Sequence, residues 1–495
     1  MGLASLERKL VADTLYLLGR TAVLRVLQIP VLLVTARVLG PEGLGLLRII
    51  DVIPSLAKYG KISFTSVTVR EVSQVTDSEG RLINSLARDV AYSASILWAI
   101  LLTILVGAGS FVLQTGPVQT GTQFAALAMF AMSIQSLYAT NCQLVKNFKL
   151  MATSSVIGEV LRAIFVLTTI TFLGIYAPLI AAAIGALITA ALLHRQMPLG
   201  ITFRLDRQEL WRQTRIAVPL SLGTLAFGLE SWVERGTIAA LWGLDRLGNY
   251  MILISLLQAA TLFINNFLEA FAVHLYQRLG TRDGPVDTER MIRLPTLTFA
   301  TIIPLFAALM LFWGPFFLTW LLPQFTKAVP LIPWAGVILW LGAIPSLYIT
   351  AMYSTRLDQQ VISIFLRLAA TAVFSLTALF LWHSDWDVEG AIVGRLASTA
   401  TMAITPILLT ARVFHPGPGE LRKALVEYLA PGIWGLLLMV GLTSLPMGTL
   451  GELLLKPLLF LLLYLPALLR WEKQCLLISR LIWPKLRGRL VRNKP

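Results

Sequence analysis

The chain has 495 residues, of which 56% are hydrophobic and only 14% are charged. A soluble protein would have about 25% charged residues, so the composition excludes a soluble enzyme and indicates a polytopic membrane protein. The net charge of +15 is expected for a membrane protein whose cytoplasmic loops are rich in Lys and Arg. Because no soluble domain is predicted, this charge does not indicate nucleic-acid binding.

Apolar segments of bilayer length recur along the whole chain, and their length favours helices over the short alternating strands of a barrel. We predict an all-α polytopic membrane protein with about fourteen transmembrane helices and short loops. The predicted spans are 12–38, 44–69, 86–113, 122–145, 151–173, 175–193, 213–241, 246–272, 292–314, 328–353, 361–382, 388–411, 422–442 and 448–470. The first span is too long for a cleavable signal peptide.

The first two predicted helices keep polar and charged residues at membrane depth. In the first, a sector of about 80° contains Thr14, Thr21, Arg25, Gln28 and Thr35. In the second, a sector of about 100° contains Arg48, Asp51, Ser55, Lys58 and Thr65. A cation at membrane depth costs at least about 2.5–3.5 kcal/mol, so it usually faces a partner or an aqueous cavity. We expect the two stripes to line a basic cavity; the alternative for each arginine is an intramembrane ion pair, such as Arg48 with Asp51.

The distribution of basic residues predicts the orientation of the chain. With the N-terminus inside, the loops on the cytoplasmic side hold most of the Lys and Arg, and the opposite loops hold little beyond Arg246 and Lys327. We therefore predict a multi-pass protein of the cytoplasmic (inner) membrane with both termini inside. The basic segment 471–495 is predicted either to lie on anionic lipid of the inner leaflet or to be an ordinary positive-inside tail.

Two segments far apart in the chain resemble each other. Ala36–Ile49 and Ala240–Ile252 align at one common offset, and this alignment pairs Gly40 with Gly243, Glu42 with Asp245 and Gly45 with Gly248. An even number of predicted helices separates them, so both copies cross the membrane in the same direction. Parallel repeats of this kind form two lobes with a substrate site between them around a central cavity. The predicted parts are 1–205 as the first lobe, 206–412 as the second lobe, 413–470 as two further helices and 471–495 as the tail.

The stretch Ala-Arg-x-Leu-Gly-Pro-Glu-Gly-x-Gly at 36–45, which ends one helix and begins another, resembles the polysaccharide flippases. These are the O-antigen and exopolysaccharide unit exporters of the multidrug/oligosaccharidyl-lipid/polysaccharide exporter superfamily. The resemblance implies that the chain flips a lipid-linked oligosaccharide with a polyprenyl diphosphate anchor. Leu44 and Leu47 stand where the family often has an aromatic residue, and Lys58 where an acidic or neutral segment is expected, so the substrate stays open.

The implied substrate directs attention to arginines, because guanidinium groups form bidentate hydrogen bonds with phosphate. The candidate substrate-binding residues are Arg25, Gln28, Arg48, Lys58, Arg235, Gln258 and Asn265. Acidic residues at depth are candidates for coupling transport to protons or sodium; they are Asp51, Glu230, Glu234 and Glu269. For the hydroxyl and amide residues of the second lobe, ordinary helix–helix hydrogen bonding is the alternative.

Other functions stay open at this point. The first alternative is a cation-coupled small-molecule efflux antiporter of the same superfamily, and the second is a membrane scaffold for glycan-assembly enzymes. A polysaccharide polymerase and glycosyltransferases are possible partners of a flippase. No phosphate-binding glycine loop, metal-spaced histidine cluster or nucleophile elbow is present, so we expect neither an enzyme nor a cofactor. The two cysteines, Cys142 and Cys475, indicate no disulfide or metal site.

Overall fold

A computed structural model describes residues 3–471 of the chain except 60–63, 65–84, 113–115, 146, 201, 281–284, 350–356, 415–418 and 447–450. Side chains are described for these residues apart from those of 3–18, 22, 25, 58, 59, 85, 219, 220, 227, 259, 260, 262–280, 285–291, 294, 357–360 and 411–414.

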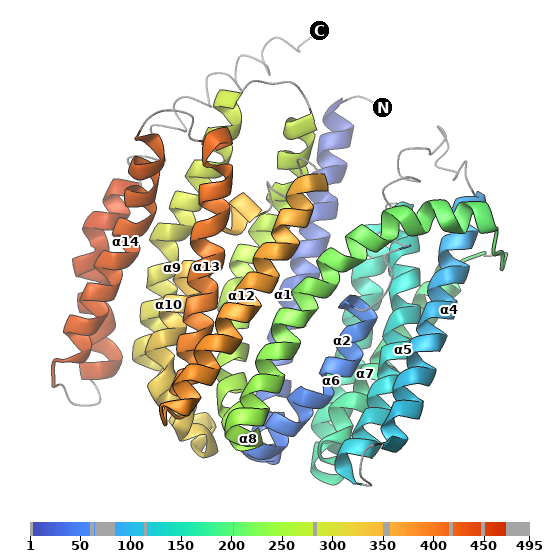
Figure 1. The fold of residues 1–495 in the computed structure, drawn as a ribbon, viewed down its shortest axis with the longest axis horizontal. Coiled ribbons are helices and arrows are strands. Elements are labelled where there is room, and N and C mark those ends of the chain that lie inside the picture. The colour runs from blue at the N-terminus through green and yellow to red at the C-terminus, as the bar shows by residue number, and fades with distance from the viewer. Residues whose placement is uncertain are drawn as a thin grey trace. The chain divides into compact units, whose positions relative to one another are not determined.

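The described chain is almost entirely helical and contains no strand (Figure 1). The α-helices are α1 Leu3–Ile50, α2 Val52–Tyr59, α4 Ser85–Gly109, α5 Pro117–Leu144, α6 Phe148–Leu173, α7 Tyr176–Gln196, α8 Arg207–Gly280, α9 Pro285–Leu321, α10 Ile332–Ala343, α12 Leu357–His383, α13 Glu389–Phe414 and α14 Glu420–Thr443. A π-helical turn, Gly451–Leu455, leads into a last helix at residues 456–471. Eleven helices among the described residues are long and apolar enough to cross a membrane. The predicted fold class, an all-α polytopic membrane protein, is confirmed.

The first two predicted helices are joined more tightly than we expected. Helix α1 continues through residues 39–43, which separate the first two predicted spans, and is broken at one residue, Gly40, where φ is 65° and ψ is −178°. Only glycine adopts this conformation readily, and Pro41 directly after it fits the first turn of a new helical segment because it needs no hydrogen bond there. Helix α8 has the same break at Gly243, with φ 85° and ψ 173°. The two glycines paired in the predicted repeat therefore interrupt two long helices with the same backbone conformation. Helix α8 is the long bent helix drawn in green in Figure 1.

The two bends contact each other through their backbones. A Cβ atom added to Gly45 would lie 2.1 Å from the carbonyl oxygen of Leu244. A Cβ atom added to Gly248 would lie 1.8 Å from the carbonyl oxygen of Pro41. Both glycines thus allow two helical turns to approach more closely than any side chain would permit.

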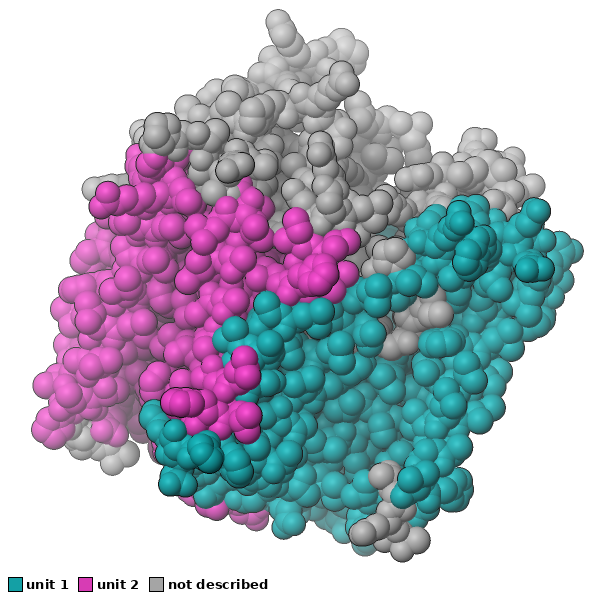
Figure 2. Space-filling view, in the orientation of Figure 1, with its two compact units in different colours: residues 1–252, 367–375, 382–388 teal, residues 253–366, 376–381, 389–495 magenta. Residues whose placement is uncertain are grey.

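The described chain forms two compact units, coloured separately in Figure 2. Unit 1 comprises residues 1–252, 367–375 and 382–388, and unit 2 comprises residues 253–366, 376–381 and 389–495. The chain passes from one unit to the other inside α8. The predicted lobes 1–205 and 206–412, and the separate parts 413–470 and 471–495, stay predictions.

Small residues explain the packing of unit 1. Helices α5 and α7 meet through alanines, among them Ala128 and Ala183, which are almost fully buried. Helices α6 and α7 approach closely at Gly158, where an added Cβ would lie 2.0 Å from Thr189 Oγ1. Since lipid removes the hydrophobic drive between helices, such close van der Waals contact stabilises the bundle.

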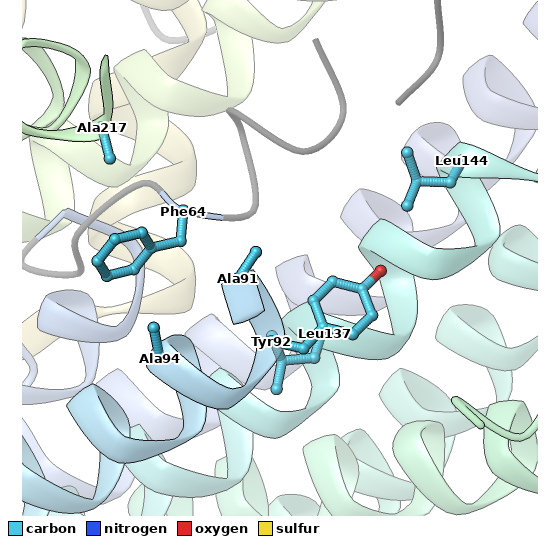
Figure 3. Packing of buried hydrophobic residues seen from close by; sticks show 7 residues of the cluster. All are labelled: Phe64, Ala91, Tyr92, Ala94, Leu137, Leu144 and Ala217. Atoms are coloured by element: carbon cyan, nitrogen blue, oxygen red, sulfur yellow. The ribbon is translucent and has the colours of Figure 1, made fainter. Parts of the chain in front are cut away.

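A larger apolar cluster joins α4, α5 and the beginning of α8, also within unit 1. The buried members of this cluster include Tyr92 of α4, Leu137 and Leu144 of α5, Ala217 of α8, and Phe64 (Figure 3). This cluster holds the beginning of α8 against α4 and α5, and α8 contributes several of the candidate site residues.

Unit 2 is built around α9, which packs against α10 and α14. Its apolar core includes Phe312 of α9, Met439 of α14, and Phe460 and Tyr464 of the last helix. Helices α10 and α14 meet at Gly432, where an added Cβ would lie 1.8 Å from the Trp340 ring. The last helix is therefore an integral part of unit 2.

Candidate functional site

The candidate site in unit 1 begins with Arg48, near the end of α1. Its Nη1 lies 3.1 Å from Oδ2 of Asp51, and the two side chains are 24% and 28% exposed. The spacing of three residues across the α1–α2 junction places both groups on one face. Arg48 therefore forms the ion pair that the sequence offered as the alternative to an arginine facing a cavity. The Nε atom of Arg48 is buried and has no hydrogen-bond acceptor.

One face of α8 reaches this ion pair. Arg235 Nη1 donates to the backbone carbonyl of Arg48 at 3.2 Å. One turn earlier, Trp232 Nε1 donates to Ser55 Oγ at 2.7 Å. We call Arg48, Asp51, Ser55, Trp232 and Arg235 the arginine cluster. It joins the two helices that the predicted repeat pairs.

The opposite face of α8 presents two carboxylates to other parts of unit 1. Glu230 Oε2 lies 3.4 Å from Nη1 of Arg367, whose side chain is 9% exposed. The hydroxyl of Tyr250 donates to Oε1 of Glu234, which is buried. Both carboxylates thus have a nearby donor, as expected for a charge held away from water.

Arg367 was not among the predicted site residues. Its partner Glu230 is 137 positions away in the chain, so helical periodicity could not connect them. A usable signal was present nevertheless, because Arg367 is a cation within the predicted span 361–382, where lipid would penalise it.

Gln28 has a partner on α6. Its Nε2 donates to Glu159 Oε1 at 3.3 Å, and Arg162 Nη1 donates to the same carboxylate at 3.1 Å. Glu159 and Arg162 form the i,i+3 pair that their spacing suggests. In the structure the Gln28 amide therefore joins α1 to α6.

The remaining predicted residues are only partly accounted for. The side chain of Gln258 is exposed. The side chains of Arg25, Lys58, Asn265 and Glu269 lie outside those that the structure describes. Their proposed roles in substrate or ion binding stay predictions.

The formal charges on the described site balance. Arg48, Arg235 and Arg367 supply three cations, and Asp51, Glu230 and Glu234 supply three anions. Such a site can exchange an internal carboxylate for an anionic ligand, or it can take up a proton or cation at a carboxylate. Among the described residues no group of three or more His, Cys, Asp and Glu side chains is arranged to hold a metal ion.

No known protein-family profile matches the chain, and no curated protein matches its sequence. Solved structures do resemble it. One is a multidrug resistance MATE family transporter of the MOP superfamily in an inward-facing conformation, with a TM-score of 0.58 and 12% identity over 88% of this chain and 96% of that one. Another is the lipid II flippase MurJ in an inward closed conformation, with a TM-score of 0.57 and 14% identity over 95% of this chain and 99% of that one.

A third similar structure is a MOP superfamily transporter from Pyrococcus furiosus, described as having a binding pocket of reverse polarity that suggests a different function. Its TM-score is 0.58 at 14% identity, over 84% of this chain and 96% of that one. At these identities the likeness establishes the fold alone. The chain shares the fold of these three structures.

Proposed function

We propose that the chain is a flippase that moves polyprenyl-diphosphate-linked oligosaccharide units across the cytoplasmic membrane by alternating access. Its product would serve the assembly of cell-surface polysaccharide. The observation that carries the proposal is the arginine cluster, in which Arg48 and Arg235 come from the two helices paired by the repeat and are joined by a hydrogen bond. The motif at 36–45 and the fold shared with a lipid II flippase support it.

The chemistry of a diphosphate explains why two arginines are useful. A diphosphate has more negative charge than one cation neutralises, and an arginine offers five donors in a fixed, planar arrangement. In the structure Asp51 accepts a hydrogen bond from Arg48. During transport the diphosphate would replace Asp51 as the acceptor, and Asp51 would recover Arg48 when the substrate leaves.

A second candidate is a cation-coupled efflux antiporter for small molecules. It is favoured by Glu230 and Glu234, two carboxylates held within the membrane-spanning part of unit 1. A carboxylate at depth can bind a proton or sodium ion on one side of the membrane and release it on the other. The MATE transporters among the similar structures support this candidate as well.

A reconstituted system separates the two candidates. The purified chain is placed in vesicles with a fluorescent polyprenyl diphosphate oligosaccharide, and a membrane-impermeable reductant then quenches the probe in the outer leaflet. A flippase makes almost all of the probe reachable, whereas protein-free vesicles protect about half of it because the leaflets are equal in area. Protection equal to that of empty vesicles, together with dye transport driven by a proton or sodium gradient, would replace the first candidate with the second.

A test in cells addresses the same proposal and its partners. Deletion of the gene should make lipid-linked oligosaccharide units accumulate on the cytoplasmic face of the inner membrane. A polysaccharide polymerase and glycosyltransferases are the proposed functional partners, since they would use and supply the transported unit. Normal surface polysaccharide without such accumulation would contradict the proposal.

A further inference from the structure

A second polar site lies in unit 2 and shares no residue with the arginine cluster. It is a cavity of about 300 Å³ between α9, α14 and the last helix at residues 456–471. Its walls include Trp434 and Trp471, and its polar lining includes Glu427 and Arg470.

Hydrogen bonds hold the walls of this cavity in place. Trp471 Nε1 donates to Thr298 Oγ1 at 3.1 Å, and the hydroxyl of Tyr464 donates to the carbonyl of Thr301 at 3.0 Å. Both bonds fix the last helix to α9. Trp434 Nε1 donates to the carbonyl of Leu463 at 3.2 Å, which fixes the last helix to α14. The cavity is therefore a built feature of three anchored helices.

Among the residues that line the cavity, Arg470 is the cation available to a ligand. Glu427 accepts hydrogen bonds from Nε and Nη2 of Arg293, the shorter at 2.6 Å, so its charge is neutralised within the protein. Arg470 is exposed, and within the described chain it has no carboxylate partner. Arg422 and Lys423 are exposed about one turn before the cavity on α14. The site therefore favours an anion.

An apolar surface continues from the cavity along α14. Exposed residues recur every three or four positions, so they form one stripe along the helix. Its large members are Val426, Ile433, Leu437 and Val440, which are 59%, 50%, 61% and 67% exposed. A ligand that fits both features has an anionic head and long hydrocarbon chains.

We propose that this cavity binds the headgroup of an anionic membrane phospholipid, whose acyl chains lie along the α14 stripe. The predicted orientation puts the beginning of α9 and α14 and the end of the last helix at the cytoplasmic side, where anionic lipids concentrate. Tryptophan is enriched at this depth of the bilayer. The chain's own segment 472–495 is the other possible occupant, but its Lys473, Arg480 and Lys485 have the same charge as Arg470.

Photo-crosslinking to the full-length protein tests the proposal. A benzophenone amino acid replaces Val426, and the protein is reconstituted in vesicles of phosphatidylcholine with or without phosphatidylglycerol. We expect adducts mainly with phosphatidylglycerol, in excess over its mole fraction. Adducts with segment 472–495, or with both lipids in proportion to their abundance, would overturn the proposal.

Charge reversal provides the matched comparison. Arg470→Glu should lower the phosphatidylglycerol adduct about tenfold, because a charge-assisted hydrogen bond becomes a repulsion. Arg195→Glu, which reverses an exposed arginine at the end of α7, should leave the adduct unchanged. Equal yields from Arg470→Glu and the unaltered protein would overturn the proposal.

The site is also separable from the proposed transport function. Excess unlabelled polyprenyl diphosphate oligosaccharide should not reduce the phosphatidylglycerol adduct, since the proposed diphosphate site, the arginine cluster, is formed by other residues, all of them in unit 1. A reduction in proportion to the added substrate would show that the cavity takes the transported lipid, which would overturn the assignment to a resident phospholipid. If the chain does not flip the oligosaccharide lipid, the expected phosphatidylglycerol adduct stays the same, so the two proposals can fail independently.

Discussion

Arg48 and Asp51 form the ion pair that the proposed transport cycle must open. Their side chains are about one-quarter exposed, so the pair lies between a surface contact and a sealed interior one. A pair in that setting contributes modestly to stability, and its partners can exchange without leaving a charge stranded in a dry core.

The two residues should therefore respond differently to substitution. Arg48→Ala removes the proposed phosphate ligand and should lower the flipping rate at least about tenfold, and Arg48→Lys should restore only part of it because an ammonium group lacks the planar fork. Asp51→Asn keeps the proposed phosphate ligand Arg48 and removes the carboxylate that competes for it, so flipping should fall less than with Arg48→Ala. Rates come from the reductant assay, normalised to the protein recovered in each vesicle preparation.

Arg195→Ala, at an exposed position of α7, is the control for loss of a positive charge. A structural ion pair would give another pattern: Arg48→Ala and Asp51→Asn would lower the yield of folded protein together, and the rate per folded molecule would stay unchanged. That pattern would remove Arg48 from the proposed substrate site.

Substitution of Tyr250 tests how much the hydrogen bond from its hydroxyl to the buried carboxylate of Glu234 stabilises the protein. Tyr250→Phe deletes that donor at a fully buried position, which should lower the free energy of unfolding by about 1–3 kcal/mol. Tyr138→Phe is the control, since its hydroxyl bonds His194 at an exposed site and should cost less. Denaturation of the purified proteins, followed by tryptophan fluorescence, measures both; equal losses would mean that burial adds nothing at Tyr250.

Contacts between residues three positions apart could be predicted from the sequence. Contacts between residues far apart in the chain could not. The partners in the pairs Arg48–Asp51 and Glu159–Arg162 are three residues apart, and this spacing places two side chains on the same face of a helix. Such pairs can be read directly from the sequence. The bond between Gln28 and Glu159 depends on which helices are neighbours, and no periodicity encodes that. The contact between Arg367 and Glu230 also depends on which helices are neighbours.

At the scale of elements, the bends of α1 and α8 are the feature that the repeat explains best. Glycines with positive φ at the paired positions Gly40 and Gly243 show that the repeated motif encodes a change of helix direction. The alignment predicted equivalent positions, but it could not predict that Gly45 and Gly248 would lie at a backbone contact. That contact depends on tertiary packing.

The contact gives a sharp prediction for Gly45 and Gly248. Alanine at either position would bring a methyl group against a backbone carbonyl, at 2.1 Å from Leu244 or 1.8 Å from Pro41, and the backbone has no flexible end to move aside. Each substitution should lower the free energy of unfolding by about 1–3 kcal/mol or more. Thermal unfolding of purified protein measures the loss.

Gly236→Ala is the matched control within α8. Nothing lies within 4 Å of an added Cβ there, and alanine has the higher helix propensity, so this variant should be neutral or slightly more stable. Equal destabilisation by Gly236→Ala and Gly248→Ala would mean that the backbone contact does not limit the packing of the two bends.

At the scale of the whole molecule, the length of the apolar segments was enough to predict the fold class. A bilayer requires about 20 apolar residues per helix, and this requirement leaves a clear pattern in the sequence. The predicted span 122–145 covers most of helix α5, which has 28 residues but is less apolar than the eleven helices counted above. Its Thr122, Thr140 and Asn141 are buried, so polar side chains here reflect packing inside the protein.

Orientation in the membrane is the last prediction, and it concerns the molecule as a whole. The segment between α7 and α8 contains the exposed Arg204, whereas the turn between α12 and α13 contains the exposed Asp385 and Asp387. Positive residues stay on the cytoplasmic side, and an odd number of predicted crossings separates the two segments. In a variant with Cys142→Ala and Cys475→Ser, a membrane-impermeable maleimide added to intact cells should therefore label Asp385→Cys but not Phe203→Cys. Opening the inner membrane should make Phe203→Cys reactive, because its side chain is 58% exposed. Labelling of both cysteines, or of Phe203→Cys alone, in intact cells would contradict an orientation with both termini inside.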